Sequence, residues 1–541
     1  MPERRAIERL LVANRGEIAA RIFRTCRRLG IETVAVAAPD DQGALHTRRA
    51  DRVVDVHSYL EPAHIVAAAE RADADGVHPG YGFLAESPAL AEAVVAAGLR
   101  WVGPPPDVLR ASGDKLEAKG LARAAGVPAL ETGSPDEVGF PLMIKAAAGG
   151  GGRGMRVVRA PEELDDAVTA ARREARAGFG DDAVFFERYV ERPRHVEVQL
   201  LADAHGTVIH LGERECSIQR RHQKVLEETP SPALDGSLRS DLTGAAVALA
   251  HELGYEGAGT VEFMLDGGRF FFLELNARIQ VEHPVTELVT GVDIVEQQLR
   301  VASGEPLGLV SRDPEGHAVE VRLYAEHPLS FLPQAGRVQA LHLPGFARVD
   351  AGVEAGDDVP VAYDPLIAKL VARGETRDEA LETLERALAE TRVTGVTTNL
   401  PFLRWLVRHP DVRAGRTTTA FLADHSPLSR YPRVPPVWRG GWRLNAEPAP
   451  PHRPPVVETA AHATDSTGAA ERAVVAPMPG VVIRVLAAEG DRVEPRDPLV
   501  VLEAMKMETP LASPFEATVK RIHVAEGDRV TGGAVLVELE E

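Results

Sequence analysis

The pattern of apolar and polar residues near the N-terminus predicts a strand, a helix and a second strand in succession. Residues 10–13 form a short apolar run, residues 18–29 place apolar side chains at helical spacing, and residues 33–36 form another apolar run. Gly30 ends the predicted helix, since glycine readily adopts the left-handed conformation found there. Such a unit is typical of parallel sheets, so we expect an α/β domain over residues 1–114.

Residues 260–283 show a different pattern and predict a β-hairpin with a polar face. Residues 260–265 form the first strand, Asp-Gly-Gly at 266–268 the turn, and residues 269–273 begin the return strand. Polar and apolar residues then alternate, which places five polar side chains on one face of an extended chain: Glu274, Asn276, Arg278, Gln280 and Glu282.

The length of the turn decides where Glu262 lies on this hairpin. With a three-residue turn, Glu262 pairs with Phe272 and lies diagonal to Glu274, roughly 7–8 Å away. A two-residue turn would place Glu262 on the opposite face. Because Mg²⁺ and Mn²⁺ prefer carboxylate and amide oxygens, we expect a metal site at Glu262, Glu274 and Asn276. An ordinary half-exposed strand is the alternative interpretation.

A glycine-rich segment, KAAAGGGGRGM at residues 145–155, lies between two predicted strands. Glycines let backbone N–H groups approach an anion closely, and Lys145 adds a positive charge. The segment lacks the GxxxxGK[ST] pattern, which excludes a Walker-type loop. We expect a mobile lid over a nucleotide, within a small α+β unit at residues 131–203. A flexible linker is the alternative interpretation.

Residues 213–224 gather basic side chains in an otherwise acidic chain. Three arginines, one histidine and one lysine occur within these twelve positions. We expect them to balance the charge of a poly-anion, and a solvated charged surface is the alternative interpretation.

The C-terminal segment repeats itself with an offset of 37 residues. Glu-Gly-Asp-Arg-Val occurs at residues 489–493 and again at 526–530. Each half is rich in valine and predicts a few short strands, so the two halves predict a small all-β sandwich over residues 473–541. Between the halves lies EAMKMET at residues 503–509, which places Lys506 at the tip of a connecting hairpin.

Lys506 is one of only seven lysines among 61 basic residues. An amine can lose its proton and attack an activated acyl group, whereas arginine stays protonated. Lys506 is therefore suited to covalent attachment of a carried group, with flexible apolar methionines on both sides. A surface lysine beside two core methionines is the alternative.

Composition and charge narrow the class of protein. A chain of 541 residues suggests three or four domains, and its net charge of −19 disfavours nucleic acid and anionic membranes as partners. Cys26 and Cys216 are the only cysteines, which excludes a disulfide framework and fits a reducing compartment. We find no signal peptide and no apolar run of 18 residues, so we expect a cytoplasmic enzyme.

Several of these motifs together resemble a known family. The lysine before four glycines, the Glu262, Glu274 and Asn276 set, and RIQVEH at residues 278–283 resemble the ATP-grasp fold of biotin carboxylase. The C-terminal segment resembles a biotinyl carrier domain, and Lys506 matches its attachment lysine. Lipoyl domains share that fold, but the methionine pair favours biotin.

The resemblance implies a domain order. It is an N-terminal α/β domain and ATP-grasp α+β domains, followed by an all-β sandwich of the biotinyl or lipoyl type. The implied boundaries are 1–114 for the N-terminal domain, 115–322 for the ATP-grasp region with its lid at 131–203, 323–445 for the C-terminal domain of biotin carboxylase, 446–472 for a Pro/Ala-rich linker, and 473–541 for the carrier.

The resemblance also implies roles for individual residues. The implied ATP site is Lys115, Lys145, Gly151, Gly152, Glu187, Arg188, Tyr189, Val190, His195, Gln219, His222, Glu262 and Glu274. The implied metal ligands for Mg²⁺ or Mn²⁺ are Glu262, Glu274 and Asn276. The implied bicarbonate site is Lys224, Arg278, Gln280 and Val281. The implied catalytic residues are Lys224, Arg278, Glu282 as general base, and Arg322, which would steady the enolate form of biotin.

The implied function is that of the α subunit of an acyl-CoA carboxylase of the acetyl- or propionyl-CoA type. Biotin held covalently on Lys506 would be carboxylated with ATP and bicarbonate, and would feed a separate carboxyltransferase β subunit. Biotin protein ligase is an expected partner, and we expect an oligomer. Two alternatives remain open: another ATP-grasp ligase that joins a carboxylate to an amine and has a lipoyl-like domain, and a non-catalytic biotin carrier.

Overall fold

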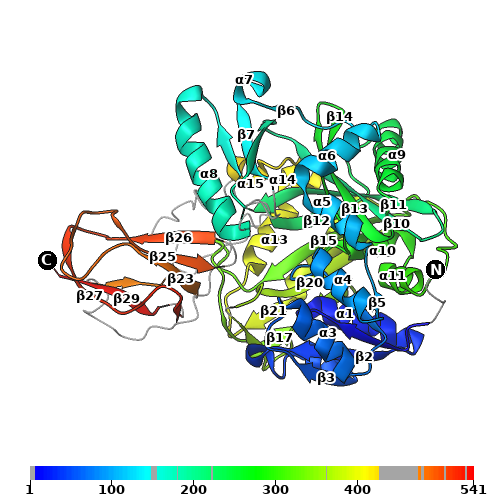
Figure 1. Ribbon diagram of the computed structural model, residues 1–541, viewed down its shortest axis with the longest axis horizontal. Coiled ribbons are helices and arrows are strands. Elements are labelled where there is room, and N and C mark those ends of the chain that lie inside the picture. The colour runs from blue at the N-terminus through cyan, green and yellow to red at the C-terminus, as the bar shows by residue number, and fades with distance from the viewer. Residues whose placement is uncertain are drawn as a thin grey trace, which may run out of the picture.

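The computed structural model describes most of the chain and shows a large mixed body and a small β domain (Figure 1). The described residues are 6–147, 155–179, 181–220, 223–360, 362–425, 473–476, 480–504, 507–530 and 533–540. The proposed linker lies outside these ranges. So do four of the site residues expected from the sequence: Gly151, Gly152, His222 and Lys506.

The N-terminal part is a parallel five-stranded sheet of order β3-β2-β1-β4-β5. Its strands are β1 (Arg9–Val12), β2 (Glu32–Ala37), β3 (Arg52–Asp55), β4 (Gly76–His78) and β5 (Arg100–Trp101). Its helices are α1 (Gly16–Leu29), α2 (Leu45–Arg49), α3 (Pro62–Arg71), α4 (Pro88–Ala96) and α5 (Pro106–Gly113). The predicted strand–helix–strand unit is confirmed, and Gly30 ends α1 with a φ of 76°.

An antiparallel sheet of eight strands forms the centre of the body. Its order is β14-β13-β10-β11-β12-β15-β20-β18. Its strands are β10 (Arg194–Ala202), β11 (Val208–Arg220), β12 (Gln223–Thr229), β13 (Gly257–Asp266), β14 (Arg269–Asn276), β15 (His317–Tyr324), β18 (Arg348–Ala351) and β20 (Leu366–Gly374). β15 pairs with β12 on one side and β20 on the other, so the boundary expected after Arg322 falls inside a central strand.

The glycine-rich segment connects two strands of a separate small sheet, as predicted. β7 (Leu142–Ala146) and β8 (Arg156–Val158) pair antiparallel on either side of it. β6 (Thr132–Gly133) and β9 (Val184–Arg188) complete the sheet, with α7 (Pro135–Val138) and α8 (Leu164–Phe179) beside it. The expected extent of this unit, to residue 203, is corrected, because β10 hydrogen-bonds along its whole length to β13 in the large sheet.

The hairpin of β13 and β14 corrects the predicted register. Asp266 pairs with Arg269, so the turn has two residues, Gly267 and Gly268, both at positive φ as this tight turn requires. A β-bulge between the pairs at Glu262 and Phe263 then restores the face that the shorter turn would have reversed. Glu262 therefore lies directly opposite Glu274 and not diagonal to it.

The remaining elements of the body surround the large sheet. The helices are α6 (Lys115–Ala124), α9 (Gly236–Glu252), α10 (His283–Thr290), α11 (Ile294–Ala302), α12 (Arg377–Glu390), α13 (Leu400–Arg408), α14 (Pro410–Arg413) and α15 (Phe421–Asp424). Two short pairs are β16 (Gly336–Arg337) with β19 (Asp358–Val359) and β17 (Ala340–His342) with β21 (Arg392–Thr394). No helix within the described ranges is long and apolar enough to cross a membrane.

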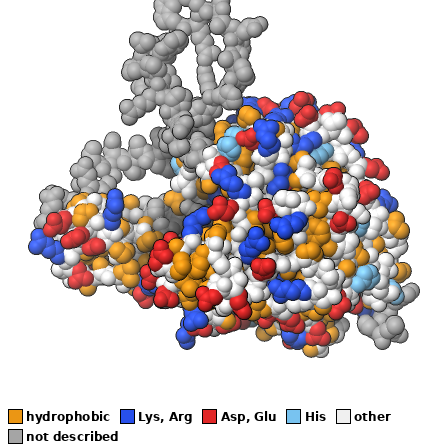
Figure 2. All heavy atoms as spheres, turned by 90° about the horizontal axis from the view of Figure 1, so that it is seen from above, with side chains coloured by type: hydrophobic (Ala, Val, Ile, Leu, Met, Phe, Trp, Pro, Cys, Tyr) orange, Lys and Arg blue, Asp and Glu red, His pale blue; other side chains and the backbone are white. Residues whose placement is uncertain are grey.

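A continuous hydrophobic core joins the N-terminal sheet to the large sheet. Leu11 and Val77 of the first sheet belong to the same buried cluster as Val198 and Phe263 of the second. On the face of the body shown in Figure 2, acidic and basic side chains are interspersed and do not form a patch of one sign. The two sheets are thus fixed against each other, and side chains from both can form one site.

The C-terminal segment forms two four-stranded sheets around its own core, as the repeat predicted. One sheet contains β22 (Ala473–Val475), β29 (Val535–Glu540), β27 (Ala517–Ile522) and β24 (Arg492–Val493). The other contains β26 (Met507–Ala512), β25 (Pro498–Ala504), β23 (Gly480–Val485) and β28 (Arg529–Val530). Ala504 pairs with Met507 across β25 and β26, so the sequence position of Lys506 falls between the two strands of a hairpin.

Candidate active site

The candidate site lies on one face of the large sheet and gathers charged side chains from five neighbouring strands. These strands are β13, β10, β11, β12 and β15, which are adjacent in the sheet. The chain after β14 adds the residues that lead into α10, whose N-cap is Glu282. Side chains that are far apart in the sequence are therefore brought within ion-pairing distance.

Lys224 is at the centre of this face. Its Nζ lies 2.7 Å from an oxygen of Glu262 and 2.7 Å from an oxygen of Glu282, and it also contacts Glu197. Burial disfavours the charged amine, but the three carboxylates outweigh it and raise the pKa of Lys224 well above its usual value. Lys224 is therefore a fixed positive charge.

Glu282 lies between two cations. Its second carboxylate oxygen is 3.0 Å from the Arg322 guanidinium on β15, and its first is held by Lys224. Burial alone would raise the pKa of this carboxyl, but Lys224, Arg322 and Arg214 lower it below the usual range. Glu282 is consequently ionised at neutral pH and able to accept a proton.

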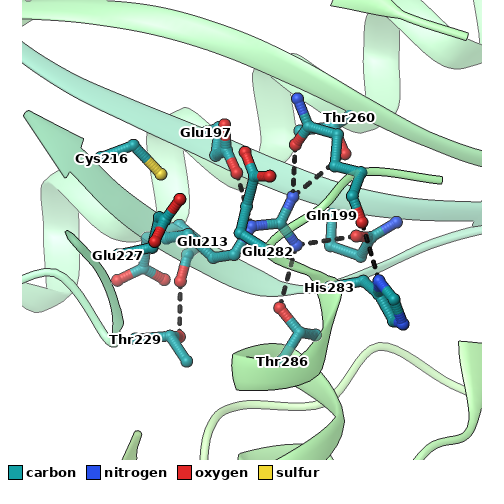
Figure 3. A network of polar contacts seen from close by, with 12 residues as sticks. Glu197, Gln199, Glu213, Cys216, Glu227, Thr229, Thr260, Glu282, His283 and Thr286 are labelled. Atoms are coloured by element: carbon teal, nitrogen blue, oxygen red, sulfur yellow. Dashed lines mark hydrogen bonds and ion pairs between the residues drawn. The ribbon is translucent and has the colours of Figure 1, made fainter. Parts of the chain in front are cut away.

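Arg214 on β11 connects the two halves of the face and is fully buried. It donates to Gln199 at 2.7 Å, Thr286 at 3.0 Å, Thr260 at 3.2 Å and Gln280 at 2.7 Å, and it also binds Glu197. Figure 3 shows this network from close by. Because its partners come from several elements, Arg214 fixes the position of Gln280 relative to the strands.

Replacing Arg214 with Met is expected to destabilise the chain. The change leaves Glu197 without its arginine in a buried setting, and breaking a buried ion pair in this way costs about 3–5 kcal/mol. Urea unfolding measures the loss. Arg192→Met, which removes an exposed pair with Asp424, is the control and should change the unfolding free energy little. Equal losses from the two substitutions would contradict this account of Arg214.

The predicted metal ligands are brought together and fit a divalent cation. Glu262 and Glu274 face each other in register, and Asn276 Nδ2 donates to Glu262 Oε1 at 2.9 Å. Burial and the neighbouring Glu262 raise the pKa of Glu274. In the described ranges no hydrogen bond reaches the Glu274 carboxylate. A cation between these hard oxygen donors would offset the repulsion.

A second cluster near this pair contains a histidine. One ligand atom each from His195, Glu197 and Glu262 lie within 4.8 Å of one another. Lys224 contacts both carboxylates of this cluster, and so it is already neutralised by the protein. Glu274, which has no such partner among the described side chains, is the better anchor for a metal ion.

The residues expected to hold bicarbonate lie beside Glu282. Gln280 Nε2 donates to Glu262 Oε1 at 2.7 Å, and the Val281 carbonyl accepts from Lys369 at 2.8 Å. Arg278 donates to Asn276 Oδ1 at 2.7 Å and to Glu86 at 3.0 Å, the latter from the N-terminal part of the chain. Each of these side chains is thus oriented by a neighbour.

Lysines expected to bind ATP converge near the small sheet. Lys145 on β7 contacts Glu187 on β9, and Lys119 on α6 contacts the other oxygen of the same carboxylate. Lys115, the first residue of α6, has its pKa lowered by burial and by Lys145, while Glu274 opposes this. Three lysines around one buried carboxylate form a site that suits phosphate.

The other expected ATP contacts lie at two places. His195 is 2.8 Å from Glu262, and Gln219 Nε2 donates to His195 Nδ1 at 2.8 Å. Burial lowers the pKa of His195, but Glu262 outweighs it and the net shift is upward. Arg188 is exposed at the end of β9, and the half-buried Tyr189 and Val190 follow it.

The structure corrects the interpretation of the basic run at residues 213–224. Arg214 is buried against Glu197, and Arg220 pairs with Glu326 at 2.5 Å, so protein carboxylates already balance both arginines. Only Lys224 of the described basic residues in this run faces the site. Sequence reasoning also missed Glu197, although Glu197 and Gln199 alternate with apolar residues along β10 as the metal ligands do along β14.

Comparisons with known proteins agree with this geometry. Four family models match: biotin carboxylase, N-terminal domain at residues 6–109; carbamoyl-phosphate synthase L chain, ATP binding domain at 128–310; biotin carboxylase C-terminal domain at 320–424; and biotin-requiring enzyme at 472–539. They define an ATP-dependent ligase joined to a domain that bears a prosthetic group.

The relatives are biotin-dependent carboxylases. A pyruvate carboxylase subunit of Methanothermobacter thermautotrophicus is 46% identical over 440 residues, which cover 77% of this chain and 90% of that protein. The propionyl-CoA carboxylase alpha chain of Ruegeria pomeroyi is 44% identical over 463 residues, covering 77% and 68%. The chain therefore belongs to the biotin carboxylase family, with a biotin carrier domain in the same polypeptide.

A solved structure shows the same fold. The biotin carboxylase domain dimer of 2-oxoglutarate carboxylase from Hydrogenobacter thermophilus, in complex with MgADP, ADP and bicarbonate, matches with a TM-score of 0.77 and 39% identity. The match covers 79% of this chain and 99% of that one. At this identity, the shared architecture includes the central sheet that carries the candidate site.

Proposed function

We propose that the chain uses ATP and bicarbonate to carboxylate biotin held on Lys506, as the α subunit of an acyl-CoA carboxylase. The observation that supports this most directly is the ionised Glu282 between Lys224 and Arg322, beside the Glu262 and Glu274 pair. A base, two anion-binding cations and a pair of metal ligands are the groups that activation of bicarbonate by ATP requires.

Glu282 acts as the general base for bicarbonate. Its cation partners are also the groups that would face incoming anions. When Lys224 or Arg322 turns toward a substrate oxygen, the carboxylate loses part of its electrostatic stabilisation and its affinity for a proton rises. The same residues therefore hold Glu282 ionised before binding and strengthen it as a base afterwards.

Other side chains position the two substrates. Arg278, Gln280 and the Val281 backbone lie one to four residues before Glu282, where bicarbonate would meet the base. Lys115 and Lys145 supply positive charge for phosphate oxygens. Glu262, Glu274 and Asn276 would hold Mg²⁺ or Mn²⁺, which offsets the charge of the transferring phosphoryl group.

The carrier domain presents the attachment lysine on a hairpin. β25 and β26 pair as far as Ala504 and Met507, and two residues connect them. A connection this short would keep Lys506 at the end of a paired ribbon, which suits recognition by a biotin protein ligase.

We also propose that the acceptor is an acyl-CoA and that its carboxylation occurs on a separate β subunit. The propionyl-CoA carboxylase relative supports an acyl-CoA, and the names of both relatives, each of which describes one chain of several, support division of the reaction between chains. We further propose a cytoplasmic oligomer, in line with the dimer of the solved relative.

The purified, biotinylated chain is expected to take label from bicarbonate without passing it to CoA. It is incubated with ATP, Mg²⁺, labelled bicarbonate and acetyl- or propionyl-CoA. Label should stay on the protein until a carboxyltransferase β subunit is added, because no site in the proposed mechanism binds CoA. Labelled malonyl- or methylmalonyl-CoA from the single chain would refute the division. Transfer to pyruvate with its own carboxyltransferase, and not to either acyl-CoA, would refute the proposed acceptor.

A further inference from the structure

Behind Arg322 lies a buried carboxylate, Glu227, that the mechanism described above does not use. Glu227 is fully buried on β12, and its Oε1 accepts from Arg322 Nε at 2.7 Å. Arg322 then extends its terminal nitrogen to Glu282 at 3.0 Å. One guanidinium therefore bridges the general base and a second carboxylate deeper in the protein.

Glu227 is only partly satisfied by this contact. Its other oxygen, Oε2, is buried without a hydrogen-bond partner. Directly across the strand pair lies Glu320, also fully buried, and neither of its oxygens has a partner. Leaving buried carboxylate oxygens unpaired costs free energy, so a chain that needed only a filled core would place apolar residues here.

The local charges explain how two carboxylates can share this place. Burial raises the pKa of Glu227 to about 7, and Arg322 opposes the rise. Burial raises the pKa of Glu320 well above its usual value. The pair therefore holds a proton at neutral pH, and the negative charge that remains lies on the side of Arg322.

We propose that Glu227 is a positioning residue for the carboxylation of biotin, which fixes the direction in which Arg322 presents its guanidinium to the site. This inference rests on the proposed function. An arginine held at Nε by a buried acceptor has its planar fork in one orientation, and its terminal nitrogens are then directed at the reacting groups. Without Glu227 the guanidinium can still pair with Glu282 but can rotate away from biotin.

The test replaces Glu227 with Gln in the full-length chain and follows two reactions. With free biotin as acceptor, kcat/KM for biotin should fall at least about tenfold, the loss expected when a charged hydrogen bond is removed. Bicarbonate-dependent ATP hydrolysis without biotin should change much less, since Lys224 still holds Glu282. Wild-type kinetics for biotin in the variant would overturn the inference.

Glu228 provides a matched control next to Glu227. It is equally buried but faces the other side of the sheet, where it pairs with Arg377 at 2.6 Å and His317 at 2.7 Å. Glu228→Gln should lower thermal stability and leave kcat/KM for biotin unchanged. If it lowers kcat/KM for biotin as much as Glu227→Gln does, both effects are structural and the inference fails.

A double substitution separates positioning from general damage. If Glu227 acts through Arg322, then Glu227→Gln combined with Arg322→Gln should be no worse than Arg322→Gln alone, whereas independent effects would multiply. Glu227→Asp serves if the Gln variant does not fold, because it keeps the charge but cannot reach Arg322 in the same direction. Additive losses, or an Asp variant with unchanged biotin kinetics, would overturn the inference.

The same experiment distinguishes this inference from the function on which it rests. An unsubstituted chain without biotin-dependent turnover overturns the proposed function and this inference together. An active unsubstituted chain with an equally active Glu227→Gln variant overturns only the inference.

Discussion

Replacing Glu282 with Gln is expected to lower bicarbonate-dependent ATP hydrolysis by at least ~10²-fold, as loss of a positioned general base does. The amide cannot accept the bicarbonate proton, although it keeps the shape of the carboxylate. ATP should bind with nearly unchanged affinity, because the lysines near Glu187 lie elsewhere in the site. Steady-state phosphate release and nucleotide binding measure the two effects.

The control for this variant is Glu287→Gln on the same helix. Glu287 is also buried, but it pairs with Arg21 at 2.8 Å and Arg348 at 2.8 Å and not with Lys224. Its loss should lower stability and leave the turnover of folded enzyme close to that of the unchanged chain. A Glu282→Gln enzyme with near wild-type turnover would show that the base is a different group.

Replacing Lys506 with Arg is expected to abolish biotin attachment completely. Arginine stays protonated and cannot attack the activated carboxyl group of biotin, so the variant should not bind avidin and should lack the added mass of biotin. Bicarbonate- and free-biotin-dependent ATP cleavage should continue, because the described catalytic groups all lie between residues 115 and 322.

Lys520 gives the matched control for attachment. It is exposed on β27 of the same domain, 3.5 Å from Glu538. Lys520→Arg should retain both avidin binding and mass. A folded Lys506→Arg chain that lost ATP cleavage with free biotin would contradict the separation of attachment from chemistry.

Much of the fold could be predicted because apolar periodicity is a local signal. The first strand–helix–strand unit, the strands around the glycine-rich segment and the doubled C-terminal sandwich all follow from short patterns. The register of the β13–β14 hairpin could not be predicted, because it depends on two features at once. A two-residue glycine turn and a bulge compensate each other, and neither has a pattern that alternation alone reveals.

The site was predicted where residue type and spacing pointed to chemistry, and was missed where side chains support others from a distance in the sequence. Glu262 and Glu274 are close in sequence and could be paired from the hairpin. Arg214 reaches Gln280 from 66 residues away, and Lys369 reaches Val281 from 88 residues away. Such contacts are set by the order of strands in the sheet, which composition and periodicity do not encode.

The position of β15 inside the large sheet has a consequence for dividing the chain into pieces. β15 pairs along its length with both β12 and β20. A fragment that ended before β15 would expose the edge of β12, and the complementary fragment would expose β20. Each edge is a row of unpaired backbone groups that invites pairing with another chain. Fragments cut at this position should therefore aggregate or reassociate with each other, so the shortest catalytic unit worth expressing includes β20.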